Sequence, residues 1–472
     1  MKSFLSNLTY AFVAQAVSLF TSVLVSFFAP KVLGMQSFGY WQLFLFYVTY
    51  VNISRLGVID GIYLRIGGRE YNRLDYALYS SEWKVFAFGQ MVFAIGFALF
   101  SVMSSPEGDR LFVLLACSVC ILIINSNNYF GYILQAVNRT KEYSISVILQ
   151  NATWFIAILF VCVFRVDEYK ILIVSYVFGH VLAGIFLMFR SREIAFCPAL
   201  EIRKAVLEIL KDARIGIKLM VSTYVSVLML GVTRFVVDGR WGIEAFSVFS
   251  LALSLTNFAL QFISQAGMVL FPALRRVDED KLKDMYEWAR DGLSIGFPIV
   301  LLLYIPIKVL LSVWLPQYED SFYFMGLLLP LCLYDGKMQM LYVTYMKVLR
   351  QEKALMIINL FSLMASIAWS LVGAYLLNDL SSISLGLVVI IAARSMLADG
   401  YLVRLLGGGV GRVAISECAL SAAYLMCVVF LPDVICLFAS IALYGIFLLC
   451  NLGRAKELIT YFNHVKRMVK SS

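Results

Sequence analysis

The sequence predicts an all-α integral membrane protein with about 14 transmembrane helices, a count that falls to about 12 if short apolar stretches are joined. Two observations carry this prediction. Hydrophobic residues make up 61% of the 472 residues and charged residues only 15%. Apolar stretches also follow one another along nearly the whole chain, and a helix of ~20 apolar residues crosses a ~30 Å hydrocarbon core with its backbone hydrogen bonds satisfied. This composition argues against a water-soluble enzyme.

The expected spans, in order, are 8–29, 40–62, 83–104, 111–137, 144–164, 170–190, 215–237, 243–274, 292–315, 322–349, 354–377, 382–405, 414–431 and 433–453. The ranges 111–137 and 243–274 exceed one bilayer thickness, so these helices are expected to tilt or to project into water. The last two spans are short and are separated by only three residues. A re-entrant hairpin or a single helix is therefore the alternative there.

Weak internal similarity suggests that the first twelve helices form two six-helix lobes in parallel repeat. Gly34 and Phe38 follow the first span, and Gly242 and Phe246 follow the seventh at the same separation. Parallel repeats of this size occur in several transporter folds. The expected organisation is an N-terminal lobe at 1–190, a cytoplasmic linker at 191–214, a C-terminal lobe at 215–405, two additional helices at 406–453 and a basic amphipathic tail at 454–472.

The distribution of Lys and Arg predicts that both termini are cytoplasmic. Nearly all cations fall in loops on the side of the N-terminus, and the opposite side holds only Lys31, Arg110, Arg165, Lys170, Arg234 and Arg240. This is the positive-inside pattern. The net charge of +9 therefore reports membrane orientation, and it does not predict nucleic-acid binding, which would need the cations on one soluble face.

Metal, redox and nucleotide chemistry are not expected. Eight of the nine cysteines lie in predicted spans, where a thiol behaves as a small apolar side chain. The chain has only two histidines, too few for a histidine-based metal site or a Ser/His/Asp triad. Gly407, Gly408 and Gly409 follow no strand and precede no Gly-Lys-Ser/Thr, so no ATP site is predicted. No cofactor is therefore expected.

Charged residues at membrane depth are the main functional signal, because a charge at the bilayer centre costs ~2.5 to 3.5 kcal/mol even on insertion scales. Arg55, Asp335, Lys337 and Arg394 are the deepest. Arg234 lies near a span end, where snorkelling is the alternative. Lys308 lies in the outer third of a span that Pro298 and Pro306 break. Asp60 and Asp399 lie in inner thirds, where an interfacial role is the alternative.

Asp335 and Lys337 cannot pair with each other, because two residues on a helix point ~200° apart. Arg394, at similar depth in the span 382–405, is the expected partner of Asp335. The alternative for these residues is a buried ion pair that only fixes helix packing.

Polar uncharged residues gather in the middle of the fourth expected span. Asn125, Asn128, Tyr129 and Gln135 are predicted to line a hydrophilic cavity. Hydrogen bonding between helices is the alternative reading.

The first 150 or so residues carry motifs of a known family. The segments Leu33-Gly34, Phe38-Gly39-Tyr40-Trp41 and above all 56–68, which reads Leu-Gly-Val-Ile-Asp-Gly-Ile-Tyr-Leu-Arg-Ile-Gly-Gly, resemble bacterial polysaccharide-unit flippases of the Wzx type. These flippases belong to the multidrug/oligosaccharidyl-lipid/polysaccharide exporter superfamily. The resemblance extends more loosely to the whole chain through the helix count and the repeat.

The resemblance implies a two-lobed, V-shaped transporter of the bacterial inner membrane. Such proteins carry undecaprenyl-diphosphate-linked oligosaccharides from the cytoplasmic to the periplasmic leaflet by alternating access, for O-antigen of lipopolysaccharide, capsule or exopolysaccharide. A polysaccharide polymerase and a chain-length regulator are the partner proteins that it suggests. No covalent bond changes, so the chain is not expected to be an enzyme.

Because the diphosphate is anionic, cations deep in the membrane are the expected substrate contacts. On this interpretation the substrate-binding residues are Arg55, Lys337 and Arg394, with Lys308 and Arg234 as secondary candidates. The acidic residues would balance charge, gate the lobes or couple an ion; they are Asp335, Asp60 and Asp399. The alternatives are a drug or organic-cation antiporter of the same architecture, which would favour an acidic cavity, and a membrane glycosyl polymerase, which the short outer loops disfavour.

Overall fold

A computed structural model describes residues 2–104, 108–198, 201–274, 279–409 and 411–457. Helices make up most of these ranges, and no strand occurs in them. The chain divides into two compact units, Met1–Tyr224 and Val225–Ser472. The division falls inside one long helix, ten residues beyond the expected end of the linker.

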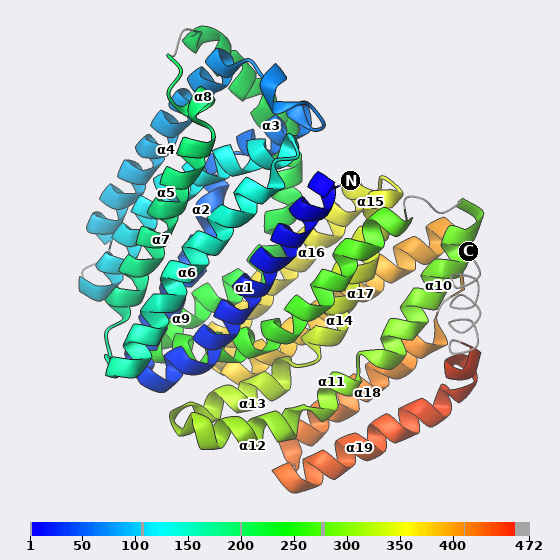
Figure 1. The fold of residues 1–472 in the computed structure, drawn as a ribbon. Coiled ribbons are helices and arrows are strands. Elements are labelled where there is room, and N and C mark those ends of the chain that lie inside the picture. Colours follow the sequence, from blue (N-terminus) through cyan, green and yellow to red (C-terminus); the bar gives the residue numbers. More distant parts are fainter. Residues whose placement is uncertain (1, 105–107, 199–200, 275–278, 410, 458–472) are drawn as a thin grey trace. The chain divides into compact units, whose positions relative to one another are not determined.

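The first unit contains the helices that Figure 1 draws from blue to green. In chain order they are α1 (Lys2–Val32), α2 (Met35–Val51), η1 (Asn52–Arg55), α3 (Val58–Ile66), η2 (Tyr71–Arg73), α4 (Tyr76–Ser104), α5 (Gly108–Ala136), α6 (Thr140–Phe164), α7 (Tyr169–Arg190), α8 (Arg192–Ala195) and the start of α9 (Ile202–Leu274). Helix α6 packs against α1 and α7, and α5 packs against α2, α4 and α7.

The second unit contains the rest of α9 and all later elements. These are α10 (Glu279–Gly296), α11 (Ile299–Leu302), α12 (Tyr304–Trp314), η3 (Pro316–Tyr318), α13 (Glu319–Leu328), α14 (Leu331–Lys337), the π-helix η4 (Met338–Tyr342), α15 (Val343–Val348), α16 (Glu352–Leu371), the π-helix η5 (Val372–Leu377), α17 (Leu380–Leu406), α18 (Arg412–Phe430) and α19 (Asp433–Cys450). Helix α17 contacts α13, α14 and α16, and α18 packs against α10, α13 and α19.

Eleven helices in the described residues are long and apolar enough to cross a membrane, or twelve if the bent pair α2/η1 and α3 is one span. The all-helical membrane fold is thus confirmed, and the count lies at the lower end of the expectation. The helix α9 merges two expected spans, because the chain turns at Gly242 (φ 81°) without an intervening loop. The expected span 322–349 is divided among α13, α14, η4 and α15, and no piece is long enough to cross alone.

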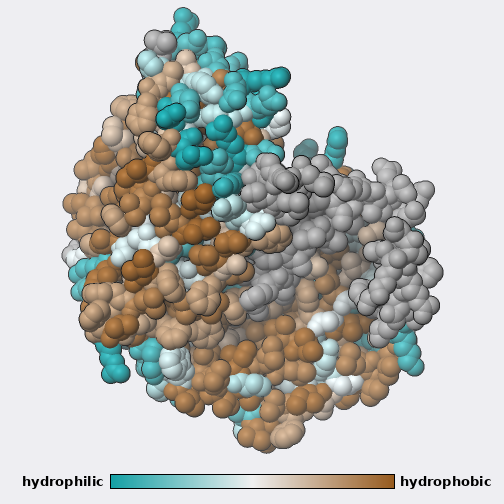
Figure 2. Space-filling model, viewed as in Figure 1, coloured by the Kyte–Doolittle hydropathy of each residue, from teal (hydrophilic) through white to brown (hydrophobic). Residues whose placement is uncertain are grey.

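The two expected C-terminal spans are separate helices. Both α18 and α19 qualify as membrane spans, and they pack against each other. On the face seen in Figure 2, hydrophobic side chains cover much of the described surface, and hydrophilic ones gather at the end of the first unit where α3 and α8 lie. Residues 458–472, and with them nearly all of the expected amphipathic tail, lie outside the described residues.

Three glycines bring α3 against the first turns of α9. A Cβ added at Gly61 would lie 2.1 Å from the backbone oxygen of Asp212, and one at Gly216 would lie 2.0 Å from the backbone oxygen of Gly57. Only glycine allows two helix backbones to approach so closely, and membrane helices use it for this purpose. The start of α9 is therefore an integral part of the first unit.

Candidate functional site

The broken helix α2/η1/α3 is the first candidate site. Leu56 and Gly57 adopt left-handed conformations (φ 49° and 78°), and α3 leaves at 61° to the preceding segment. Glycine adopts such a conformation at little cost. The break frees backbone carbonyls inside the first unit, and at membrane depth these need hydrogen-bond donors.

Polar side chains of α4 and α5 supply those donors. The Nδ2 atom of Asn125 lies 3.3 Å from the carbonyl oxygen of Val51 and 2.9 Å from Oγ of Ser54. The Nε2 atom of Gln90 donates to the Ser54 carbonyl at 3.0 Å. Asn128 donates to Oδ1 of Asn52 at 2.7 Å. The asparagines thus bind the broken helix to its neighbours.

The four predicted cavity-lining residues have different environments. Asn125 is fully buried, and Tyr129 is buried with its hydroxyl donating to the carbonyl oxygen of Tyr79. Asn128 and Gln135 are half-buried. Asn125, Asn128 and Tyr129 all form hydrogen bonds to other helices, which was the alternative to lining a cavity. That these residues line a cavity stays a prediction.

Arg55 and Asp60 face each other across the break. The Nη2 atom of Arg55 lies 3.4 Å from a carboxylate oxygen of Asp60, and both side chains are about nine-tenths buried. The guanidinium also lies 5.4 Å from the centroid of the Tyr132 ring. Arg55 follows the C-terminal end of α2 and Asp60 lies in the first turn of α3. Each charge therefore lies at the helix end whose dipole favours it.

The second candidate site is a polar cluster around Arg394 in the second unit. Its Nη1 lies 3.0 Å from Asp335, its Nε donates to Asn359 at 2.9 Å, and its Nη2 donates to Ser226 at 3.1 Å. The expected pairing of Arg394 with Asp335 is therefore confirmed. The four side chains come from α9, α14, α16 and α17, so the cluster ties four helices together.

This cluster reaches the surface of its unit on one side. The Asp335 side chain is 13% exposed and that of Arg394 is 5% exposed. The exposed Gln339 donates to the other carboxylate oxygen of Asp335. Gln339 lies in the π-helix η4, and short π segments inside α-helices are frequent at functional sites.

Lys337 has a different environment. Its ammonium lies 2.5 Å from Glu417 and 3.2 Å from Oγ of Ser294, and the two charged side chains are 3% and 0% exposed. In this conformation the Lys337 ammonium therefore does not reach a surface of its unit. Glu417, in α18, was not among the sequence candidates. Its position four residues inside the expected span 414–431 was the available signal.

The remaining predicted residues also have polar contacts. Lys308 lies 2.6 Å from the half-exposed carboxylate of Asp433. Arg234 donates to Ser250 at 2.9 Å and lies 5.0 Å from the centroid of the Phe246 ring. Asp399 accepts a hydrogen bond from Tyr286 at 2.5 Å and lies 3.8 Å from Arg290.

A further ionic cluster at the end of α3 was missed by the sequence reasoning, which treated Arg65 as a cytoplasmic loop charge. Arg65 lies 2.8 Å from the fully buried Glu82, 2.9 Å from Asp212 and 3.5 Å from Glu208. Burial raises the pKa of Asp212 to about 6 in spite of Arg65. Membership of Arg65 in the 56–68 motif was the available signal.

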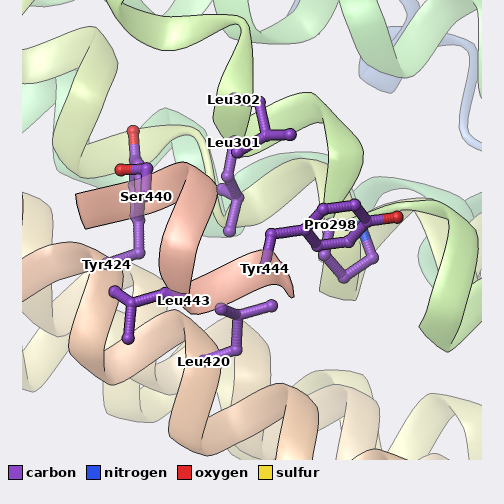
Figure 3. A pocket seen from close by; sticks show the side chains of 8 residues that line it. All are labelled: Pro298, Leu301, Leu302, Leu420, Tyr424, Ser440, Leu443 and Tyr444. Atoms are coloured by element: carbon purple, nitrogen blue, oxygen red, sulfur yellow. The ribbon is translucent and has the colours of Figure 1, made fainter. Parts of the chain in front are cut away.

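A metal site and one apolar pocket are the alternatives to these clusters. In the described part of the chain, no group of His, Cys, Asp or Glu has an arrangement that could hold a metal ion. The pocket in Figure 3 lies between α11, α18 and α19. Its lining is apolar or uncharged, from Pro298, Leu301, Leu302, Leu420, Tyr424, Ser440, Leu443 and Tyr444. A diphosphate would find no cation there.

Residues 4–277 match the model of a family described as polysaccharide biosynthesis protein, and this range is more than half of the chain. The chain belongs to this family. No curated protein sequence matches it. The resemblance to Wzx-type flippases that the 56–68 motif indicated is thus confirmed at the level of the family.

Solved structures of transporters share the fold of this polysaccharide biosynthesis protein. The lipid II flippase MurJ in an inward closed conformation is similar with a TM-score of 0.66 and 11% identity, covering 95% of this chain and 99% of that one. An inward-facing multidrug resistance MATE family transporter has a TM-score of 0.61 and 13% identity, with coverages of 86% and 98%. A transporter of the same superfamily from Pyrococcus furiosus gives 0.52 and 11%, with coverages of 86% and 96%.

These similarities establish the fold of the superfamily over nearly the whole length of the known structures. The proteins that share the fold are described as a flippase and as transporters. The fold of this chain is therefore that of known membrane transporters, and its family is one of polysaccharide biosynthesis. Neither identifies the sugar unit.

Proposed function

We propose that this protein moves undecaprenyl-diphosphate-linked oligosaccharide repeat units from the cytoplasmic to the periplasmic leaflet of the bacterial inner membrane by alternating access. The translocated units would serve the assembly of O-antigen, capsule or exopolysaccharide. The family supports the polysaccharide pathway, and the fold shared with a lipid II flippase supports a lipid-linked substrate. Both termini are proposed to be cytoplasmic, on the distribution of Lys and Arg.

The observation that carries this proposal is the environment of Arg394. Three side chains hold its guanidinium in place, and one of them is the partly exposed carboxylate of Asp335. Arginine binds phosphate oxygens through two parallel N–H donors. A diphosphate that displaces Asp335 would thus meet a charged group that is already oriented, and Asp335 would neutralise it again when the substrate leaves.

Arg55 is likewise paired with a carboxylate, in the first unit. Its contact with Asp60 is long, and the guanidinium lies beside an aromatic ring. We propose Arg55 and Arg394 as substrate contacts, with Asp60 and Asp335 as their exchangeable partners. Lys308 and Arg234 stay secondary candidates, and Asp399 stays a candidate for gating or ion coupling. For Lys337 we propose a packing role instead, because Glu417 and Ser294 hold its ammonium in the interior.

A complementation assay tests the proposal. Arg394→Ala should abolish surface polysaccharide in a strain that lacks the gene, while the amount of protein in the membrane stays normal. Arg404→Ala is the matched control, because Arg404 is an exposed arginine of the same helix α17. Full polysaccharide in the Arg394→Ala strain would remove this residue from the substrate site.

The two rival functions predict other outcomes. A drug or organic-cation antiporter would change the sensitivity of the host to cationic drugs and leave its polysaccharide intact. A glycosyl polymerase would leave translocated single units when it is deleted, whereas loss of a flippase leaves lipid-linked units on the cytoplasmic side. Locating the accumulated lipid-linked sugar in a deletion strain therefore distinguishes all three.

A further inference from the structure

The outer face of the first turns of α9 differs in charge from its inner face. Residues 202–218 precede the membrane span that begins at Met220. On the inner face, Glu208 and Asp212 contact Arg65, and Ala205 is fully buried. Both acidic residues of this segment therefore point into the unit.

The outer face carries a row of cations and leucines. Arg203, Leu207, Leu210, Arg214 and Lys218 are all exposed, and their spacing of i, i+4, i+7, i+11 and i+15 places them on one side of a helix. We name these five residues the outer stripe. Leu207 is 53% exposed and Leu210 is 62% exposed. The stripe thus has an apolar centre with cations at both ends.

The three cations of the outer stripe have no partner within the described part of the chain. No hydrogen bond or ion pair joins Arg203, Arg214 or Lys218 to another described residue. The exposed lysines beside the stripe differ in this respect. Lys204 pairs with Glu201 at 2.7 Å, and Lys211 pairs with Glu208 at 2.7 Å.

We propose that the outer stripe binds anionic phospholipid headgroups of the leaflet on its side of the membrane. Exposed leucines flanked by unpaired cations fit the boundary between headgroups and acyl chains, where leucines enter the apolar zone and cations meet phosphates. Naming that leaflet as cytoplasmic rests on the proposed orientation. The binding itself does not depend on transport.

Spacing favours several phospholipids over one diphosphate. Eleven residues separate Arg203 from Arg214, which is about 16 Å along a helix. A single diphosphate is far too short to contact both, whereas neighbouring phospholipids each present one phosphate. A soluble anionic protein is also disfavoured, because the stripe directly precedes the membrane span that begins at Met220 and so lies close to the headgroups.

The function of this contact is to anchor the first unit. Gly57, Gly61 and Gly216 join the start of α9 to α3, and Arg65 joins it to Glu82. A lipid contact on the outer stripe is therefore transmitted to the broken helix that carries Arg55 and Asp60. Anionic lipid should stabilise this unit more than zwitterionic lipid does.

Lipid titration of the purified full-length protein in neutral detergent tests the proposal. The probes are phosphatidylglycerol and phosphatidylcholine, and bound lipid is counted by native mass spectrometry. The triple variant R203Q/R214Q/K218Q should bind phosphatidylglycerol on the order of 100-fold more weakly, about fivefold for each lost cation. Its binding of phosphatidylcholine should stay within about twofold of that of the unmodified protein.

The matched control is K204Q/K211Q, which removes two exposed cations of the same helix that already have carboxylate partners. It should retain most of the binding. If the triple variant does not fold, the single variants R203Q and R214Q carry the test, each with a loss of about fivefold. R203K/R214K keeps the charge and should bind as the unmodified protein does.

Three results would overturn the proposal. The first is phosphatidylglycerol binding by the triple variant within twofold of the unmodified protein. The second is an equal loss in the control. The third is a loss of undecaprenyl diphosphate binding, with phosphatidylglycerol binding unchanged, which would assign the stripe to the substrate. All three are binding measurements, so they separate a failure here from a failure of the proposed transport.

Discussion

Asp335 and Lys337 are separated by one residue of α14, yet their charges have opposite environments. Asp335 pairs with Arg394 in a cluster that the exposed Gln339 joins to the surface of the unit. Lys337 pairs with Glu417 in an interior where both side chains are almost completely buried. The helix turns the two residues ~200° apart, so one face of α14 reaches the surface of its unit and the other packs in the interior.

Breaking the buried ion pair of Lys337 and Glu417 should give the largest effect on stability. Glu417→Ala or Lys337→Ala leaves one buried charge without its partner, which typically costs ~3 to 5 kcal/mol. The double variant K337M/E417L removes both charges at similar volume and should recover most of the loss. Thermal unfolding of the purified proteins measures this. Single variants as stable as the unmodified protein would contradict the burial of this ion pair.

Close helix packing in the first unit should give the next largest effect. A Cβ at position 61 would collide with the backbone of α9, not with a movable side chain. Gly61→Ala should therefore cost ~1 to 3 kcal/mol and disturb the Arg65 cluster. Gly89→Ala is the control, because a Cβ added there would have no atom within 4 Å. An unchanged melting temperature in Gly61→Ala would contradict the glycine contact.

The pH dependence of stability should report on Asp212. Its folded pKa of about 6 lies above the usual value of 3.8, so the folded state holds this proton more tightly than the unfolded state does. The contribution of Asp212 to stability is then greatest below about pH 4 and falls as the pH rises to about 6. Asp212→Asn removes this slope. The melting temperatures of the two proteins, measured from pH 4 to pH 8, should converge at the acidic end, and a constant difference would contradict the assignment.

Asp335→Asn should have the smallest effect on stability. Arg394 keeps its bonds to Asn359 and Ser226, and the partly exposed site is open to solvent on one side. The amount of folded protein should therefore be close to normal. Binding of the diphosphate should become tighter and its release slower, because the competing carboxylate is absent. Weaker binding in this variant would mean that Asp335 contacts the substrate favourably.

Part of this arrangement could be predicted from sequence for a physical reason. Depth in the membrane and helical periodicity are local properties, and they correctly placed Asp335 and Arg394 together and turned Lys337 away from Asp335. The motif at 56–68 indicated the family, because its residues are contiguous in the chain and can be read without knowing their neighbours in space.

Other parts depend on which helices are neighbours, and one sequence does not contain that information. Glu417 could not be assigned to Lys337, because 79 residues and several helices lie between them. Arg65 has one partner on α4, 17 residues along the chain, and others on α9, of which Glu208 is 143 residues along it. The structure differs from the expected spans at Gly242 and in 322–349, because hydropathy does not distinguish a kinked or broken helix from separate spans.

The proposed transport depends above all on binding of the lipid diphosphate by Arg394. Its most direct test is translocation of a fluorescent undecaprenyl-diphosphate-linked oligosaccharide in proteoliposomes that contain equal amounts of each protein. At equal amounts of folded protein, we expect that Arg394→Ala loses translocation by more than tenfold, while Arg404→Ala keeps it. Translocation by Arg394→Ala at the rate of the unmodified protein would contradict this role of Arg394.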